Sequence, residues 1–419
     1  HTLTPMGARL LNRWVLFPLR SVREIEERQN GVECFFRQPD FRDLCQQELE
    51  RIGDLERIVS KVAVGRVNPR EMQQLRIALD SIARLKDACA DTTDDFIRQL
   101  GLRLDCCEEL RSRILHDLRL DPPALVNKGG VIGSGVSEEL DDLRAISTSG
   151  KDYLLQMQQR ESQQTGIPSL KIGFNNVFGY YIEVRNTYKD NVPADWIRKQ
   201  TLAQAERYIT QELKEYEEKI LGAEDRILAL ETRLYNELAQ YALGFIALLQ
   251  RNARALSTLD CLHSLAKVAA LHRYVRPVVD DSDILEITDG RHPIIEQLPD
   301  AEPFVPNSTK LNGTTSQIML ITGPNMAGKS TYIRQVATIA IMAQAGSFVP
   351  ADRVHMGVID RVFTRIGAGD DLSRGRSTFL VEMQETANIL NNATPRSLIV
   401  LDEIGRGTST FDGISIAWS

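Results

Sequence analysis

The feature that most limits how this chain can fold is a long stretch without proline, between Pro193 and Pro277. Proline breaks helices because it lacks a backbone N–H and its ring clashes with the preceding turn, so this stretch favours long helices. A helix over residues 203–249 would be about 70 Å long at about 1.5 Å per residue. This length predicts a rigid spacer or a coiled-coil-like arm, with an ordinary packed helix as the alternative. Apolar residues recur three or four positions apart, as on one helix face, at Leu213, Tyr216, Ile220, Ala223, Ile227, Leu230 and Leu234.

The remaining helical segments are recognised by their periodicity and their caps. Residues 1–120 show helical periodicity with few helix breakers, so an all-helical segment is predicted there. A Gly-rich loop at 128–135 then leads into a helix after Ser137, and a domain boundary is expected near this loop. Within the proline-free stretch, a second helix is predicted to start at a Ser257-Thr258 cap and to end near Arg273.

Strand patterns occur in two regions. Aromatic and β-branched residues over 170–184 flank the turn residues Asn175 and Asn176, which predicts a hairpin in a small β-containing module. After Pro277, short β-rich runs alternate with helical ones, which is typical of an α/β domain. Its predicted strands are 284–288, 317–322 and 397–401, and its predicted helices are 330–345 and 378–391.

One segment of the α/β region fits the phosphate-binding pattern G-x-x-x-x-G-K-[ST]. It follows the predicted strand at 318–321 and opens a predicted helix, which is the context that a P-loop requires. The two glycines would let the backbone wrap a polyphosphate with its N–H groups facing the anion. Lys329 would reach the β- and γ-phosphates, and the Ser330 hydroxyl would bind Mg²⁺. The segment comprises Gly323, Pro324, Asn325, Met326, Ala327, Gly328, Lys329 and Ser330.

A second motif is an apolar strand at 398–401 that ends in two acids, about 70 residues after the P-loop. This arrangement is typical of a Walker B motif. Asp402 would hold the water shell of Mg²⁺, and Glu403 would polarise the water that attacks the γ-phosphate.

A third motif is the Gly-rich polar run at 367–378, which enters a predicted helix. Ser377 and Thr378 would cap this helix and aim free N–H groups at an anion, although an ordinary N-cap is the alternative. The predicted apolar face of the helix consists of Phe379, Met383, Ala387 and Leu390.

These motifs resemble those of the MutS family of DNA mismatch-repair proteins. The strings TGPNMAGKST at 322–331 and DEIGRGTST at 402–410 look like the ATPase domain of this family, and they are highly specific. The resemblance extends to residues 179–182, 129–132 and 2–7, and it covers essentially the whole chain.

The resemblance implies a multidomain α and α/β fold. A long helical core and lever domain would carry an inserted small β-containing clamp, and an ABC-type P-loop ATPase domain of the α/β class would follow. The expected domains are a first core and lever part at 1–150, a clamp with a β-hairpin at 151–210, returning lever helices at 211–275, and an ATPase domain at 276–419 that is truncated at its C-terminus.

The resemblance also implies roles for single residues. ATP would be bound by the P-loop from Gly323 to Thr331, and Phe304 would stack on its adenine. Asn325 would help to hold the γ-phosphate or the attacking water, alongside Lys329 and Glu403 as catalytic residues. Mg²⁺ would be held by Ser330 and Asp402, and Ser377 would complete the site of a partner subunit. Ala327 stands where many relatives carry a second glycine, at a free position of the pattern.

The function implied is that of a DNA mismatch-repair ATPase. It would clamp double-stranded DNA as a homodimer or a MutS-type heterodimer, work with a MutL-type partner, and couple ATP binding and hydrolysis to the state of the clamp. Two alternatives stay open: a paralogue that binds branched or recombining DNA without reading mismatches, and a non-catalytic architectural DNA-binding protein. The mismatch-reading domain would precede His1 and the dimerisation segment would follow Ser419, so the isolated chain is expected to hydrolyse ATP weakly.

The distribution of charge along the chain limits where it can contact DNA. The formal net charge of −7 argues against a chain that is basic throughout, so a DNA contact must use a local patch. Residues 166–210 have six Lys and Arg against four Asp and Glu, whereas residues 211–249 have four against eight. This segregation predicts sequence-independent phosphate contacts at the clamp, with a solvated hairpin face as the alternative. The candidate contacts are Arg185, Lys189, Arg198, Lys199 and Arg207.

Cysteine spacing and hydropathy exclude two other classes of protein. The six cysteines show no C-x-x-C spacing and no nearby His cluster, which argues against zinc sites and predicts free thiols. The longest apolar runs, such as 336–343, have less than half of the roughly 20 residues that a membrane span needs. A cytoplasmic protein is therefore expected, associated with the nucleoid if it is bacterial.

Overall fold

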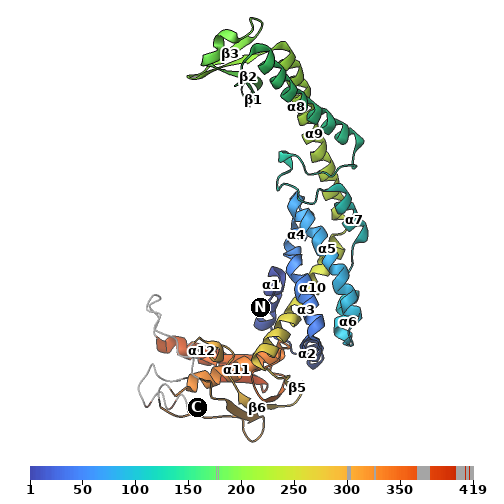
Figure 1. The fold of residues 1–419 in the computed structure, drawn as a ribbon. Helices are drawn as coiled ribbons and strands as arrows, with labels where there is room; N and C mark the ends of the chain where they lie inside the picture. The colour runs from blue at the N-terminus through green and yellow to red at the C-terminus, as the bar shows by residue number, and fades with distance from the viewer. Residues whose placement is uncertain are drawn as a thin grey trace. The chain divides into compact units, whose positions relative to one another are not determined.

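The structure is a computed structural model that describes residues 1–175, 177, 179–299, 303–324, 327–365, 378–402, 411 and 415. The described chain is largely helical, with small sheets, and it forms two compact units (Figure 1). The first unit comprises 1–56, 80–106 and 249–419, and the second comprises 57–79 and 107–248. Three of the boundaries between the units fall inside helices, namely α4 (Leu55–Ala63), α5 (Pro69–Ala90) and α10 (Ile246–His272).

The N-terminal part of the first unit is helical, as the sequence predicts. The first two helices begin at side-chain caps: Thr4 accepts a hydrogen bond from the Gly7 N–H, and Ser21 accepts one from the Glu24 N–H. Besides parts of α4, α5 and α10, the helices of this unit before residue 249 are α1 (Pro5–Leu16), α2 (Val22–Arg37), α3 (Pro39–Ile52) and α6 (Asp95–Leu102).

The C-terminal part of the first unit has two small sheets and two helices. One sheet has the strand order β5-β8-β6-β7, in which only the β5–β8 pair is parallel, and the other consists of the parallel pair β9 and β10. Helix α11 packs against β6 and β10 in one apolar core. The elements are β5 (Val278–Asp280), β6 (Ile284–Gly290), β7 (Asn307–Asn312), α11 (Lys329–Gln344), β8 (Arg353–Gly357), β9 (Arg361–Arg365), α12 (Thr378–Asn392) and β10 (Ser397–Leu401).

Most of the predicted α/β elements are confirmed, but two predictions are wrong. The predicted strand at 317–322 does not form, because no described strand pairs with it, and Ile318 and Leu320 stay 89% and 87% exposed. Helix α12 does not bury the predicted apolar face, since Leu390 is exposed whereas Glu382 is buried. The reason is an ion-pair cluster that the apolar pattern does not show: Arg365 of β9 lies within ion-pair distance of Glu382 and Glu385.

The second unit contains a pair of long helices and a four-stranded sheet. Helices α8 and α9 run side by side, and the sheet lies at one end of this pair (Figure 1). The sheet is antiparallel throughout, with the order β1-β2-β4-β3, and the hairpin β1–β2 confirms the prediction for 170–184. The elements are α7 (Glu108–Asp117), α8 (Glu138–Thr165), β1 (Lys171–Asn175), β2 (Gly179–Arg185), β3 (Ile197–Thr201), β4 (Ala205–Ile209) and α9 (Gln211–Leu243), together with part of α4, α5 and α10.

The predicted long helix is shorter than expected. Residues 205–209 form strand β4, because they pair with both β2 and β3, and α9 begins only after the Thr210 cap. At about 1.5 Å per residue, α9 is still about 50 Å long. The next helix, α10, begins at Ile246 rather than at Ser257. The Ser257 and Thr258 hydroxyls donate to backbone carbonyls four residues earlier, so they lie inside the helix and do not cap it.

Two further expectations concern cysteines and membranes. All six cysteines are free, and burial raises the pKa of the Cys34 thiol to about 11 and that of Cys89 to about 12. These thiols therefore stay protonated at neutral pH. Within the described part of the chain, no helix combines the length and the apolar character needed to cross a bilayer.

Candidate functional site

The P-loop segment ends in a left-handed turn that starts a helix. Gly328 has φ 86° and forms the N-cap of α11, which begins at Lys329. Gly323, at the start of the segment, also has a positive φ, of 151°. The Gly328 carbonyl accepts the first helical hydrogen bond, from the Tyr332 N–H at 2.9 Å. The N–H groups before Tyr332 thus have no partner inside the helix, and they form the type of terminus that binds anions.

Lys329 folds back over this loop. Its Nζ donates to the Gly323 carbonyl at 2.6 Å and to the Pro324 carbonyl at 2.7 Å. The ammonium group is thus held beside the loop that the sequence assigns to phosphates. Ser330 and Thr331, in the first turn of α11, are both half-buried, while Pro324 and Ala327 are exposed.

Strand β10 brings the acidic motif into the same core as the P-loop helix. Leu398 and Val400 of β10 are buried with Val336 and Ile339 of α11. The strand pairs in parallel with β9, and the Asp402 N–H extends this pairing by donating to the Arg365 carbonyl at 2.7 Å. The backbone of Asp402 is therefore fixed at the end of a strand that packs against α11.

Several predicted site residues lie outside the described part of the chain. These are Asn325, Met326, Ser377 and Glu403. Phe304 is described and is half-buried in the segment before β7.

The residues present fit a nucleotide with Mg²⁺. No group of three or more His, Cys, Asp or Glu side chains that could hold a metal occurs among the described residues. Mg²⁺ in nucleotide sites is usually held by one or two protein oxygens together with phosphates and waters, so a dedicated cluster is not required. The Ser330 hydroxyl and the Asp402 carboxylate supply oxygens of that kind.

Sequence reasoning missed a tyrosine that anchors the P-loop helix. The Tyr332 hydroxyl forms a hydrogen bond of 2.6 Å with the Thr309 hydroxyl of β7, and it lies 3.3 Å from the Met319 sulfur. This residue ties the first turn of α11 to β7 and to the segment that enters the P-loop. The signal in the sequence that could have indicated this anchor is a tyrosine, with its polar hydroxyl, on a mostly apolar helix face.

The clamp candidates are distributed over the four-stranded sheet of the second unit. Arg207 of β4 donates to Glu183 of β2 at 2.9 Å and to Gln200 of β3 at 3.0 Å, and its guanidinium lies 4.2 Å from the ring centroid of Tyr181. Its side chain is only 18% exposed. Arg207 is therefore a bridge within the sheet.

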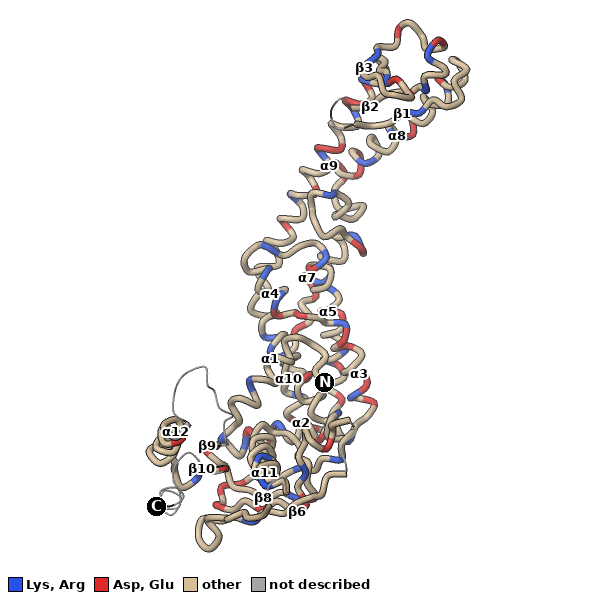
Figure 2. Tube along the Cα trace, turned by 90° about the vertical axis from the view of Figure 1, so that its left-hand side faces the viewer, with Lys and Arg blue, Asp and Glu red and all other residues tan. Residues whose placement is uncertain are grey.

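The other clamp candidates are more accessible. Arg198 pairs with Glu206 at 3.3 Å, but its side chain is 61% exposed. Arg185, Lys189 and Lys199 are exposed as well. Acidic residues lie among the Lys and Arg of this region (Figure 2), and two of the candidates face a carboxylate, Arg198 that of Glu206 and Arg207 that of Glu183, so the candidates do not form one uniformly basic face.

Comparisons with known proteins cover the whole chain. The family model for MutS domain III matches residues 1–266, and the model for MutS domain V matches residues 319–419. The chain belongs to the MutS family. It is 60% identical over 420 residues to the DNA mismatch repair protein MutS of Bacteroides thetaiotaomicron, which covers 100% of this chain and 49% of that protein. The proteins of the same name from Parabacteroides distasonis and Phocaeicola vulgatus are also 60% identical, over 100% of this chain and 48% of theirs.

The chain thus spans about half the length of the curated MutS relatives it matches. The P-loop and the acidic motif both lie in the match to MutS domain V, and the sheet with the clamp candidates lies in the match to domain III. Phe304 and strands β5 to β7 lie between the two matches.

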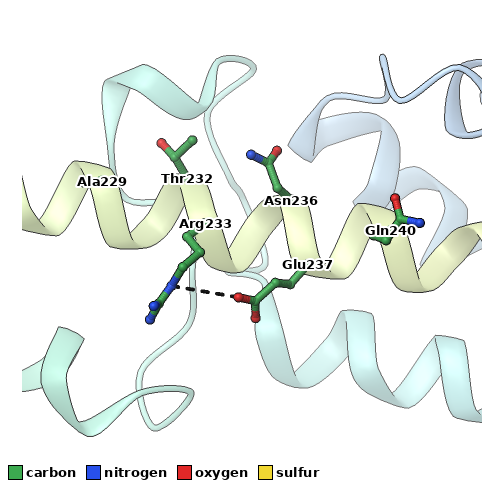
Figure 3. A pocket seen from close by; sticks show the side chains of 6 residues that line it. All are labelled: Ala229, Thr232, Arg233, Asn236, Glu237 and Gln240. Atoms are coloured by element: carbon green, nitrogen blue, oxygen red, sulfur yellow. Dashed lines mark ion pairs between the residues drawn. The ribbon is translucent and has the colours of Figure 1, made fainter.

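The MutS domain III match also contains a hollow on one face of α9 (Figure 3). An ion pair between Arg233 and Glu237, at 3.8 Å, crosses it. It contains none of the residues that the sequence singles out, and its walls come from α9 alone, so it is the bare polar face of a helix. The lining residues are Ala229, Thr232, Arg233, Asn236, Glu237 and Gln240.

Proposed function

We propose that this chain is the central part of a DNA mismatch-repair ATPase that clamps duplex DNA as a dimer and couples ATP binding and hydrolysis to the state of the clamp. The observation that carries this proposal is the packing of α11, which opens with Lys329 and Ser330, against β10, which leads to Asp402. The relatives named for mismatch repair, at 60% identity, support the choice of pathway.

In the proposed site, each residue has a defined task. The N–H groups at the start of α11 and the Lys329 ammonium bind the phosphates of ATP. Ser330 and Asp402 hold Mg²⁺, which neutralises phosphate charge when it is bound. Glu403 orients the attacking water, and Asn325 assists at the γ-phosphate.

Two further contacts complete the proposed nucleotide site. Phe304 stacks on the adenine ring, and Ser377 acts on the nucleotide bound by the partner subunit of the dimer. A site shared in this way depends on dimer formation, so the isolated chain is expected to turn over ATP slowly.

The DNA contact is proposed to lie on the sheet of the second unit. Exposed cations there can contact phosphates without reading the base sequence. Arg185, Lys189, Arg198 and Lys199 are better suited to this role than Arg207, because their side chains are exposed whereas that of Arg207 is only 18% exposed. Such contacts are weakened by salt, since binding releases counterions from DNA.

A MutL-type partner is proposed as well, on the family relationship alone. The alternative of a paralogue for branched DNA is less well supported, because eight relatives at 52% to 60% identity carry the name DNA mismatch repair protein MutS. An architectural protein without turnover is disfavoured by the presence of Lys329, Ser330, Asp402 and Glu403 together.

The decisive experiment uses the full-length protein that contains this chain. Glu403→Ala should keep ATP binding within about twofold and abolish steady-state turnover, because it removes only the group that orients water. Lys329→Ala should instead weaken ATP binding by about tenfold to a hundredfold, the value of a charge-assisted hydrogen bond. Undiminished hydrolysis by Glu403→Ala would remove that residue from its role, and absence of ATP turnover in the unsubstituted protein, with and without DNA, would refute the proposed function.

A further inference from the structure

The C-terminal end of the P-loop helix is held by one buried glutamine. Gln344 is the last residue of α11 and is 4% exposed. Its amide nitrogen donates to the Leu19 carbonyl at 2.8 Å and to the Ile359 carbonyl at 2.9 Å. Its amide oxygen accepts from the Ile359 N–H at 2.8 Å. The backbone carbonyl of Gln344 also accepts, from the Leu19 N–H at 3.0 Å. Both the nitrogen and the oxygen of the side-chain amide thus form hydrogen bonds within the first unit.

An arginine also contacts this end of α11. Arg28 of α2 donates to the Ala345 carbonyl at 3.1 Å, just beyond the last turn, and its guanidinium lies 3.8 Å from the ring centroid of Trp14 in α1. A cation at this position also interacts favourably with the negative end of the helix dipole. The helix end is therefore fixed to the segment 14–28, which comprises the end of α1, the linker and the first part of α2.

These contacts connect the two parts of the nucleotide site to that segment. Lys329 and Ser330 lie at the opposite end of α11, about 22 Å away along the helix at about 1.5 Å per residue. Ile359 lies just before β9, whose partner β10 leads to Asp402. Gln344 is the residue at which the P-loop helix, the strand pair of the acidic motif and the linker at 17–21 meet.

We propose that Gln344 is a positioning residue that transmits the nucleotide state from the P-loop and Asp402 to the segment 14–28. This inference rests on the proposed function. Helices shift as rigid bodies by about 1–2 Å in such transitions, so a change at the phosphate end of α11 reaches Gln344 with little loss. The paired hydrogen bonds to Leu19 and Ile359 then either move the linker with the helix or break.

The test is amide hydrogen exchange on the full-length protein, with and without Mg²⁺ and a non-hydrolysable ATP analogue. In the unsubstituted protein, the analogue is expected to change exchange within residues 17–28 by about tenfold, most clearly at the Leu19 N–H. Gln344→Leu removes the three side-chain hydrogen bonds. It should reduce this change by at least about threefold, since only the backbone bond of Leu19 and the contact of Arg28 remain, while the affinity for the analogue, measured by titration calorimetry, stays within about twofold.

A matched control is available in the same helix. Gln335 is fully buried in α11, and neither atom of its amide has a hydrogen-bond partner among the described residues. Gln335→Leu should therefore keep both the affinity and the exchange response. Arg28→Met provides a second variant if Gln344→Leu does not fold. It removes one hydrogen bond and should reduce the response by about threefold.

The outcomes separate the two proposals. Failure of the unsubstituted protein to bind the analogue overturns the proposed function and this inference with it. Binding without any exchange response at 17–28 overturns the inference alone. A full response retained in Gln344→Leu, or in Arg28→Met where the leucine variant does not fold, also overturns it.

Discussion

Arg144 and Glu231 form an ion pair in which Nη2 and Oε1 lie 2.6 Å apart, with the Glu231 side chain only 1% exposed. The other carboxylate oxygen of Glu231 accepts from the Val131 N–H at 3.0 Å, and Arg144 also donates to the carbonyls of Ile132 and Gly133. This pair fixes the Gly-rich loop, which precedes α8, against α9 within the second unit.

Glu231→Gln should destabilise the second unit by about 1–3 kcal/mol, because Arg144 loses its buried counter-charge and keeps only Asp141, which lies 3.3 Å away and is 37% exposed. Urea unfolding followed by circular dichroism measures this loss. The control is Glu139→Gln, which removes the exposed pair with Arg226. An exposed pair contributes about 0–1 kcal/mol, so equal losses in the two variants would contradict the role of Glu231.

The buried ring of His263 is expected to make the folded protein less stable in mild acid. The residue is fully buried, its ring meets Phe35 edge to face at 5.9 Å, and neither ring nitrogen has a partner among the described residues. Burial lowers its pKa to about 4. In the unfolded chain this imidazole has its ordinary pKa near 6.5, so it binds a proton more readily there than in the folded chain. The free energy of unfolding is therefore highest above about pH 6.5 and falls as the pH drops towards 4. The total loss expected is about 3 kcal/mol, at about 1.4 kcal/mol per pKa unit.

His263→Leu should flatten this pH dependence, since leucine does not titrate. The measurement is the free energy of unfolding in urea at several values between pH 7 and pH 4. His116→Gln serves as the control, because His116 is 64% exposed. The assignment fails if His263→Leu loses stability in acid as steeply as the unsubstituted protein.

Asp260 is expected to hold the N-terminal segment onto α10. Its buried carboxylate accepts from the Leu3 N–H at 2.9 Å, from the Thr4 N–H at 2.8 Å and from the Thr4 hydroxyl at 2.6 Å. Asp260→Asn replaces one acceptor by an NH₂ group that faces donors, so it should cost about 2 kcal/mol and speed exchange at the Leu3 and Thr4 amides. Asp281→Asn, at an exposed position, should do neither. Unchanged exchange in Asp260→Asn would speak against this anchoring.

The clamp assignment is tested by the salt dependence of DNA binding. Arg198→Ala combined with Lys199→Ala should reduce the slope of log affinity against log salt by about 2, since each lost phosphate contact removes about one unit. Arg207→Ala should leave the slope unchanged and destabilise the sheet by about 1–2 kcal/mol, because Arg207 binds Glu183 and lies over Tyr181. A slope that drops only in Arg207→Ala would reverse the two roles.

Local signals in the sequence predicted the elements that are determined locally. Ser137 caps α8 as expected, the predicted hairpin strands β1 and β2 pair with each other, and the glycine before Lys329 opens α11. In each case the deciding hydrogen bonds or dihedral angles involve residues close together in the chain, so a short pattern contains the relevant information.

Two of the wrong predictions depend on distant residues. Residues 205–209 have a helix-compatible composition, but pairing with β2, some twenty residues earlier by the register of Glu183 with Arg207, makes them a strand. The buried face of α12 is set by Arg365, which lies on another element. Gln344 likewise shows no motif, because its importance comes from Leu19 and Ile359, and neither is near it in the sequence.

The two P-loop glycines, Gly323 and Gly328, impose a requirement that is distinct from small size. A Cβ atom placed on either one meets no heavy atom of the described residues within 4 Å, whereas both have a positive φ. An L-residue at these positions would therefore suffer backbone strain without any collision. What the loop selects for at these two positions is thus a backbone conformation and not free volume, so replacing either glycine by alanine should disturb the loop even though the methyl group has room.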